Sequence, residues 1–347
     1  MAMADVTVRG AGIFGLSIAW TCARRGARVV VVDPFGPGAG ASGGVVGALA
    51  PHVPENWNPK KAFQFDSLRM ADAFWTGVET VGGVSPGYGR TGRLQPLADA
   101  GAVALARSRA TQAETLWDGF AAWEVIPASD AFGWAPVSPS GWLIRDTLSA
   151  RLHPARAVAA LVAALKRQGV PIVTEAPDSG AVVWATGSAG LAELSQAFDR
   201  PVGTAVKGQA AVLGLAMPQD APQLFSGGVH IVPHTDGTVA IGSTSERDFD
   251  SPRDTDSQLD EVIAAARLAV PLLAEAPVVD RWAGLRPRAR SRAPVMGPWP
   301  GRPGHFVANG GFKIGFGMAP KVAQVMADLV LDDRDAVPDG FRLETCL

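Results

Sequence analysis

The chain has 347 residues, of which 47% are hydrophobic and 18% charged, and its formal net charge is −2. This balance provides enough apolar side chains for a large core and excludes an intrinsically disordered chain. It gives no reason to expect nucleic acid or an anionic membrane surface as a partner. The two cysteines, Cys22 and Cys346, are too few for a disulfide framework. We expect free thiols in a reducing compartment, with Cys22 buried and Cys346 loose near the end of the chain.

No apolar run of the sequence reaches the length of a membrane-spanning helix. The first recognisable motif begins at residue 6, so we expect no signal peptide ahead of it. These observations predict a cytoplasmic protein without a membrane anchor.

Residues 6–33 predict a strand, a helix and a second strand that together bind a dinucleotide. Gly10 permits a tight strand-to-helix turn, Gly12 lets the backbone approach a pyrophosphate, and Gly15 lets the helix pack on the strand. The start of the helix presents unpaired N–H groups to the phosphates. Asp33, which ends the second strand, can accept hydrogen bonds from a ribose. Because strands flank the glycine motif and an acid closes it, the signal is stronger than a lone glycine pattern.

A glycine-rich stretch, residues 34–47, follows directly. So many glycines are too costly in entropy for the interior of a helix or strand. A flexible linker is the alternative, but the apolar residues 48–51 come next, so we favour a loop lying against something flat. Ser42 offers a hydroxyl in the middle of this loop.

Apolar spacing then predicts the elements of the first half of the chain. We expect a helix around residues 65–81, a short strand at 93–97, a helix at about 103–123 and a helix at 154–168. A fully apolar strand, residues 180–184, ends in the small-residue turn Ala185-Thr186-Gly187, which predicts a place in a parallel sheet beside the first strand.

The pattern changes after residue 200. Short strands at 202–215, 228–233 and 238–243 are separated by turn residues, which favours an antiparallel sheet. We expect a helix at 257–273 with a capping box formed by Ser257 and Asp260. Loops are predicted for 282–318, and a last helix for 319–331 beginning with Pro320.

The fold class that follows is α/β, in an α+β arrangement of two interleaved domains. A Rossmann-like nucleotide-binding domain is predicted from residues 1–84, 141–200 and 300–345. An antiparallel-sheet substrate domain is predicted from residues 85–140 and 201–299.

Several motifs resemble those of a known family in collinear order over nearly the whole chain. They are GAGIFGLSIAW, GASGGVVGALAP, LHPARAVAALVAALKRQGV, AVVWATGS, PVGTAVKGQ, HIVPHTDGTVAIGSTSERDFD, WAGLRP and FVANGGFKIGFGMAP. With these motifs the chain resembles the FAD-dependent amino acid oxidase family, which includes glycine oxidase, D-amino acid oxidase and sarcosine oxidase. Glycine-oxidase-like members are the most similar.

The resemblance implies FAD as the cofactor, held by residues from every part of the nucleotide-binding domain. The implied set is Gly10, Gly12, Ile13, Phe14 and Gly15 at the pyrophosphate, Asp33 at the ribose, Ala41, Ser42, Gly47 and Ala48 along the diphosphate and flavin, Ala185, Thr186 and Gly187 at the strand end, and Gly311, Lys313, Ile314, Gly315 and Phe316 over the isoalloxazine. Neither cysteine matches the position at which the sarcosine oxidase branch attaches its flavin, so non-covalent binding is implied. The turn at 174–181 is shorter than in the family, which leaves open how the adenine is held.

The resemblance also implies a substrate site. Arg286 occupies the position of the arginine that grips the substrate carboxylate, and a guanidinium suits that task because it pairs with a planar carboxylate through two hydrogen bonds. His230 stands where the family usually has a tyrosine, Lys313 where glycine-oxidase-like members have an arginine, and Ser245 where a more apolar residue is usual. A purely structural role remains the alternative for Arg286 and for His230.

The implied reaction is hydride transfer from the α-carbon of an amine or amino acid to flavin N5, with O2 or another electron acceptor reoxidising the flavin. The imine product hydrolyses to an oxo acid. No metal site is expected, because the five histidines show no ligand spacing. Alternatives are a flavin oxidase domain that acts on a carboxymethylaminomethyl group of tRNA uridine, an FAD-binding protein without turnover, and an NAD-dependent dehydrogenase. Whether the chain forms a homo-oligomer stays open.

Overall fold

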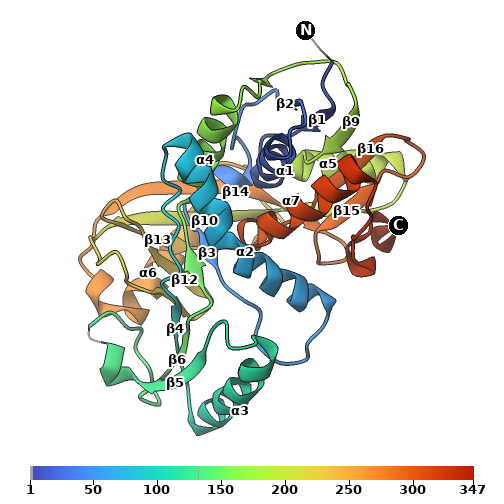
Figure 1. The fold of residues 1–347 in the computed structure, drawn as a ribbon. Helices are drawn as coiled ribbons and strands as arrows, with labels where there is room; N and C mark the ends of the chain where they lie inside the picture. Colours follow the sequence, from blue (N-terminus) through green and yellow to red (C-terminus); the bar gives the residue numbers. More distant parts are fainter. Residues whose placement is uncertain (1–2, 132) are drawn as a thin grey trace.

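Two large β-sheets and the helices packed on them make up residues 3–131 and 133–347, the part of the chain that this computed structural model describes (Figure 1). In Figure 1 the six-stranded sheet lies in the upper part of the molecule and the eight-stranded sheet below it. Among the described residues, no helix combines the length and the apolar character that crossing a bilayer requires.

The six-stranded sheet has the order β15-β16-β9-β1-β2-β8. Its strands are β1 (Val6–Arg9), β2 (Val29–Val32), β8 (Ile172–Val173), β9 (Ala181–Trp184), β15 (Val295–Pro298) and β16 (His305–Asn309). β1 pairs in parallel with both β2 and β9, as the sequence predicts, and β15 alone runs antiparallel to its neighbour. The valines of β1 and β2 are largely buried, as expected for a parallel sheet covered on both faces.

Four helices pack together beside this sheet: α1 (Ile13–Arg24), α2 (Pro59–Gly82), α4 (Pro154–Arg167) and α7 (Gly315–Asp332). Helices α1 and α2 each contact both α4 and α7. Helix α4 shows why these segments are helical, because Pro154 sits at its first turn and apolar residues recur along one face. A two-stranded sheet of β3 (Ala48–Leu49) and β7 (Ala150–Arg151) joins the glycine-rich loop to the start of α4.

The eight-stranded sheet has the order β14-β10-β13-β12-β11-β4-β6-β5 and is antiparallel except for the β11–β4 pair. Its strands are β4 (Arg93–Pro96), β5 (Trp123–Pro127), β6 (Trp142–Asp146), β10 (Gly203–Gly214), β11 (Gln223–Ser226), β12 (Val229–Pro233), β13 (Thr238–Gly242) and β14 (Val278–Ala289). Helix α6 (Ser257–Ala269) packs on β10, β12 and β13, and α3 (Ala100–Leu116) packs on β5. Helix α5 (Gly187–Ala197) contacts β16 of the first sheet and β10 and β14 of the second, so it links the two sheets.

Three predicted segments are wrong in their bounds. The helix predicted for 103–123 ends at Leu116, because Asp118 and Gly119 adopt positive φ and turn the chain, so that Trp123 begins β5. The loops predicted for 282–318 contain most of β14 and all of β15 and β16. The last helix begins four residues earlier than predicted, and Pro320 lies inside it.

The N-cap of α6 is Asp256, whose side chain accepts a hydrogen bond from the backbone of Gln258, and not Ser257. Cys346 is also placed differently from the prediction. It is buried against the side chains of Leu343 and Trp299 and is not loose, whereas Cys22 is buried as expected.

Two strands lie outside the sheets that the predicted domain bounds assign to them. β6 falls in the 141–200 segment but pairs in the eight-stranded sheet, and β15 falls in the 201–299 segment but pairs in the six-stranded sheet. The bounds of the two domains therefore stay a prediction, in which β6 has to move to the substrate domain and β15 to the nucleotide-binding domain.

Candidate active site

A cavity of about 1070 Å³ is lined by residues of both large sheets. One end is formed by the turn after β1, the loop after β2 and the end of β9; the other end is formed by β12, β14 and the residues before α7. The cavity exceeds the upper range typical of drug-sized ligands, so it has room for a dinucleotide together with a small molecule.

Two glycines at the turn after β1, Gly10 and Gly15, leave no room for a side chain. Gly10 has φ +104, and a Cβ there would collide with the carbonyl of Ala185, whose carbon would be 2.7 Å away. A Cβ on Gly15 would overlap the carbonyl oxygen of Gly10. Gly10 and Gly12 line the cavity, whereas Gly15 lies outside the lining and permits the close packing of α1 on β1.

The first turn of α1 faces the cavity with Ile13 and Phe14 in its wall. The hydroxyl of Ser42, from the glycine-rich loop, accepts a hydrogen bond of 2.9 Å from the backbone N–H of Ile13. This contact brings the loop over the helix start, as predicted, and makes it part of the cavity wall together with Ala41, Gly47 and Ala48.

Asp33 lies at the end of β2, where the sequence predicts a ribose ligand. Its carboxylate accepts hydrogen bonds from the backbone N–H groups of Ala11 at 2.7 Å and Phe35 at 2.9 Å. These contacts fix the carboxylate at the cavity wall. Because a carboxylate has about four lone-pair positions, it keeps the capacity to accept sugar hydroxyls.

A second helix start also faces the cavity. Gly315, Phe316 and Gly317, the first turn of α7, are in the wall, and no side chain caps this helix. The sequence prediction missed this feature because it placed the helix start at residue 319. The positive end of a helix dipole and its free N–H groups favour electron-rich or anionic ligand atoms.

Three further residues of the predicted cofactor set occupy distinct places. The Oγ1 atom of Thr186 is buried at the cavity wall without a hydrogen-bond partner among the described residues, as expected for an atom that a ligand would satisfy. Gly311 lies in the wall, close against the ring of Phe14. Ile314 is not part of the lining and packs on the core below it as the N-cap of α7. The remaining predicted residues, Ala185 and Gly187, are in the wall.

At the other end of the cavity, Arg286 projects from β14 across β10. A Cβ on Gly208 would overlap the guanidinium, so the missing side chain at Gly208 provides the space in which that group lies. The Nη1 atom donates a hydrogen bond of 3.1 Å to the backbone carbonyl of Thr244. Burial lowers the pKa of Arg286 to about 10, opposed by the nearby charge of Glu246, so the guanidinium stays protonated at neutral pH.

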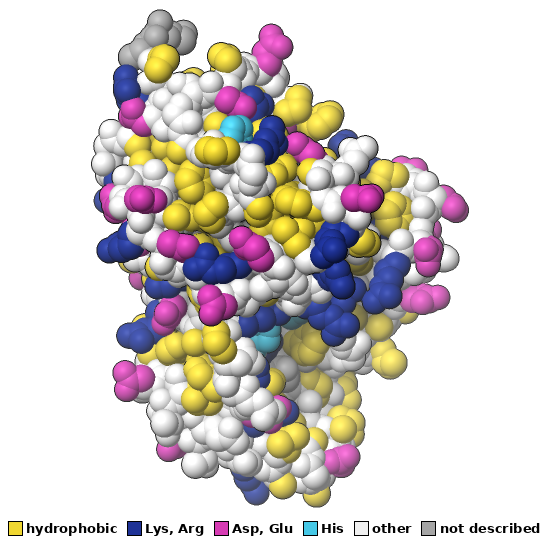
Figure 2. Space-filling view, turned by 90° about the vertical axis from the view of Figure 1, so that its right-hand side faces the viewer, with side chains coloured by type: hydrophobic (Ala, Val, Ile, Leu, Met, Phe, Trp, Pro, Cys, Tyr) yellow, Lys and Arg dark blue, Asp and Glu magenta, His cyan; other side chains and the backbone are white. Residues whose placement is uncertain are grey.

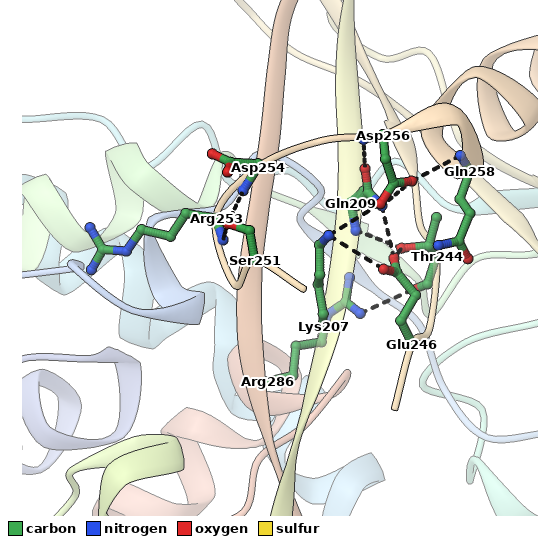
Figure 3. Close-up of polar contacts among 10 residues, drawn as sticks. All are labelled: Lys207, Gln209, Thr244, Glu246, Ser251, Arg253, Asp254, Asp256, Gln258 and Arg286. Atoms are coloured by element: carbon green, nitrogen blue, oxygen red, sulfur yellow. Dashed lines mark hydrogen bonds and ion pairs between the residues drawn. The ribbon is translucent and has the colours of Figure 1, made fainter. Parts of the chain in front are cut away.

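A polar network behind Arg286 holds the segment that this arginine contacts (Figure 3). The carboxylate of Glu246 accepts hydrogen bonds from Thr244 and from the amide of Gln209, the latter at 3.0 Å. Lys207 lies 3.5 Å from Glu246 and 3.3 Å from Asp256. Lys207 is therefore paired with both carboxylates, whereas no carboxylate of the described residues lies within ion-pair distance of Arg286.

The loop that joins β13 to α6 adds a cation to the cavity wall. Arg253 lines the cavity and projects away from the network around Arg286, on the other side of β14 in Figure 3. The loop is fixed at its far end by Asp256, whose backbone N–H donates to Gln209 at 2.8 Å. The sequence prediction did not include Arg253, since no motif marks it.

His230 lies in the wall as predicted. Its ring packs on Phe225 with centroids 4.6 Å apart, and its Nδ1 atom is buried without a hydrogen-bond partner among the described residues. Burial, helped by the charges of Arg93 and Lys313, lowers the pKa of His230 to about 3. The imidazole is therefore neutral at physiological pH.

Lys313 is also in the wall, and its pKa is lowered by burial and by the positive charges of Arg286 and Arg288. Ser245 is different: it is exposed and lies outside the cavity lining, so its predicted role at the site is corrected. Ser243, two residues earlier, lines the cavity instead. Trp282, also in the wall, was missed because the sequence analysis treated its segment as a loop.

A parallel sheet with a glycine turn, an acid at the end of the second strand and two helix starts at one cavity defines a dinucleotide-binding α/β protein. The model of the family "FAD dependent oxidoreductase" (DAO) matches residues 5–329. The chain belongs to this family, and its cofactor is FAD, as the sequence predicts; the NAD-dependent alternative is thereby excluded. The lining described above fits such a cofactor, since it offers two helix starts, an acid and an unsatisfied hydroxyl along one cavity.

Individual relatives agree with this family. Glycine oxidase of Geobacillus kaustophilus is 25% identical over 94% of this chain and 92% of its own length. The bifunctional protein ThiO/ThiG of a Nostoc species is 25% identical over 95% of this chain, which spans about half (53%) of that protein.

Two solved structures share the fold. The crystal structure of the Geobacillus kaustophilus glycine oxidase superposes with a TM-score of 0.84 at 22% identity, covering 98% of both chains. Iminodiacetate oxidase of Chelativorans sp. BNC1 gives a TM-score of 0.83 at 20% identity, covering 97% of this chain and 98% of that one. The predicted α/β fold class is confirmed.

Proposed function

We propose that this chain oxidises the C–N bond of a small amine or amino acid of the glycine, sarcosine or D-amino acid type. The observation that carries the proposal is Arg286, a protonated guanidinium 9% exposed in the cavity wall. A buried cation without an ion-pair partner in direct contact is costly unless a ligand compensates it. A carboxylate does so through two hydrogen bonds, which also fix the orientation of the substrate.

The chain's own residues position the substrate. Bound FAD supplies the hydride acceptor at N5 for the α-carbon, and the imine product hydrolyses to an oxo acid. Arg286 binds the carboxylate and thereby sets where the α-carbon lies. His230, being neutral, offers a hydrogen bond without adding charge, and Lys313 adds positive potential beside the flavin end.

The same proposal assigns the dinucleotide end. Gly10, Gly12 and the first turn of α1 would receive the pyrophosphate, and Asp33 the ribose. The loop residues around Ser42 and the start of α7 would receive the rest of the cofactor. Gly15 and Ile314 would act through packing alone. Among the described residues that line the cavity there is no cysteine, which supports non-covalent binding.

Two of the named relatives support a carboxylate-bearing substrate, since they are oxidases of glycine and of iminodiacetate. Basic side chains, with acidic ones between them, gather in a band across the middle of the face shown in Figure 2, around a histidine. Positive potential attracts the carboxylate group of such a substrate.

The test is anaerobic bleaching of the flavin by a panel of glycine, sarcosine, D-amino acids and larger amines. Bleaching by at least one carboxylate-bearing amine, and not by the matching amine without a carboxylate, is expected. Reoxidation in air compared with an artificial acceptor then separates an oxidase from a dehydrogenase.

The panel includes an RNA-bound carboxymethylaminomethyl group. We include this substrate because the chain is similar to the tRNA 5-methylaminomethyl-2-thiouridine biosynthesis bifunctional protein MnmC of Polaromonas naphthalenivorans. The identity is 28% over 94% of this chain and 56% of that protein. Bleaching by the RNA substrate alone would overturn the small-molecule proposal. If the purified protein is yellow but no amine bleaches its flavin, the remaining interpretation is an FAD-binding protein without amine turnover.

A further inference from the structure

Two histidines and an aspartate that are far apart in the sequence meet at one point of the surface. His153 is the N-cap of α4, His234 follows β12, and Asp236 lies in the turn between β12 and β13. One nitrogen or oxygen ligand atom from each residue lies within 4.8 Å of the other two. The two imidazole rings face each other with centroids 4.5 Å apart. The sequence analysis missed this cluster because it considered only spacing along the chain.

One ring nitrogen of each histidine in this cluster lacks a hydrogen-bond partner among the described residues. His234 is 4% exposed, and its Nε2 atom is buried and unpartnered, as is the Nδ1 atom of His153. Buried polar atoms in proteins are nearly always satisfied by protein, water or an ion. Two such atoms beside a carboxylate point to a bound cation.

Thr238 orients His234 in the manner of a metal ligand. Its hydroxyl donates a hydrogen bond of 2.6 Å to Oδ1 of Asp236, so its lone pairs face the Nδ1 atom of His234 at 3.2 Å. His234 must therefore donate from Nδ1, which leaves the lone pair on Nε2 directed into the cluster. Metal-binding histidines are usually fixed by such a hydrogen bond from the other ring nitrogen.

Two arginines also face the cluster. Arg156 lies 3.1 Å from Oδ2 of Asp236, and Arg151 donates to the backbone carbonyls of Gly87 and Gln219. Arg151 therefore directs its hydrogen bonds to backbone carbonyls outside the cluster, and the carboxylate of Asp236 offsets the positive charge of Arg156. Burial is the main cause that lowers the pKa of both histidines, a direction that favours the neutral imidazole.

We propose that His153, His234 and Asp236 form a binding site for a divalent transition-metal ion, with zinc as the ion whose preferred ligands they match. Three protein ligands leave a fourth position for water. The site joins the start of α4, where Pro154 lines the cofactor cavity, to the β12–β13 turn of the eight-stranded sheet. A bound ion would stabilise the folded protein by holding these segments together.

The experiment uses the full-length flavoprotein without a histidine tag, stripped with a chelator and titrated with Zn²⁺ and with Co²⁺. Binding of one equivalent, a visible absorption band with Co²⁺ and a higher Tm with Zn²⁺ are expected. His234→Gln and Asp236→Asn are expected to abolish the band. Thr238→Val, which keeps all three ligands, should weaken binding about 10- to 100-fold.

His52→Gln is the matched control, because it removes a histidine outside the cluster and should leave metal binding unchanged. The proposal is overturned if the wild type binds no equivalent of either metal. It is also overturned if His234→Gln and Asp236→Asn bind as tightly as the wild type. Should either variant fail to fold, Thr238→Val decides, and unchanged affinity in that variant contradicts the assigned orientation of His234.

Discussion

The two ends of the cavity differ in whether backbone or side-chain groups line them. The dinucleotide end is made mainly of backbone: glycines at the turn after β1, a glycine-rich loop and the starts of α1 and α7. The end that we propose binds the substrate is made of side chains, with His230 on β12, Arg286 on β14 and Lys313 before α7. Backbone recognition depends on local geometry that few substitutions preserve. Side-chain recognition can change through single residues while the cofactor end stays intact.

The largest effect is expected from a substitution at the end of the cavity that is lined by backbone. Gly10→Ala would place a Cβ against the carbonyl of Ala185 in a backbone conformation with φ +104. The variant is expected to lose bound flavin or to fail to fold, as measured by the ratio of flavin to protein absorbance and by Tm. Gly26→Ala is the matched control, because Gly26 also has positive φ but has open space around it, so only about 1–2 kcal/mol of backbone strain is expected. Normal flavin content in Gly10→Ala would contradict the geometry.

The next largest effect is expected from a substitution at the end of the cavity that is lined by side chains. Arg286→Ala is expected to raise the apparent KM about 100- to 1000-fold, roughly 3–4 kcal/mol, because it removes the charged partner of the carboxylate. Flavin content and the flavin spectrum should stay unchanged. Arg290→Ala, an exposed arginine just beyond the end of β14, serves as the control. A normal KM in Arg286→Ala would refute the carboxylate role.

A smaller effect tests how Arg286 is seated. Gly208→Ala is expected to raise KM about tenfold, because the methyl group displaces the guanidinium without removing its charge. Gly214→Ala, at the end of the same strand, places a methyl no closer than 3.2 Å to its neighbours and should leave KM near that of the wild type. If the two variants behave alike, the space at Gly208 does not position the arginine.

The smallest effect concerns pH. The pKa of His230 is lowered from 6.5 to about 3 in the folded protein, so between these values the unfolded chain binds a proton that the folded chain excludes. His230 therefore makes the protein less stable as pH falls from about 6.5 toward 3. In His230→Gln the loss of unfolding free energy between pH 7 and pH 5 should be smaller by about 1–2 kcal/mol, measured by urea unfolding. An equal loss in both proteins would show that His230 titrates near its ordinary pKa.

Prediction from sequence succeeded for the α/β fold class and for FAD, because the glycine turn, the helix start and the acid that ends the second strand lie within one strand–helix–strand unit; the ligand roles of Gly10, Gly12 and Asp33 stay predictions. It failed where packing overrides local pattern. The segment 282–318 contains many glycines, prolines and arginines and still forms long strands, because the partner strand β10 lies beside β14 only in the folded chain.

The start of α7 shows the same limit. Pro320 suggested a first turn, but the helix begins at Gly315, where the residues preceding it pack on Phe14 and the cavity. Residue type could not tell Ser245 and Ser243 apart, because both are serines; only the folded chain places Ser243 in the cavity wall and leaves Ser245 exposed.

The sequence by itself determined the α/β fold class, the FAD family and the cofactor, because these depend on residue types within motifs, and it pointed to Arg286 as the proposed carboxylate-binding residue. Only the tertiary structure decided how Arg286 is seated over Gly208, that His230 is neutral and that Arg253 reaches the cavity. It alone brought His153, His234 and Asp236 together. The physical reason is that burial, charge balance and contact between distant segments arise only when the strands of both sheets have paired.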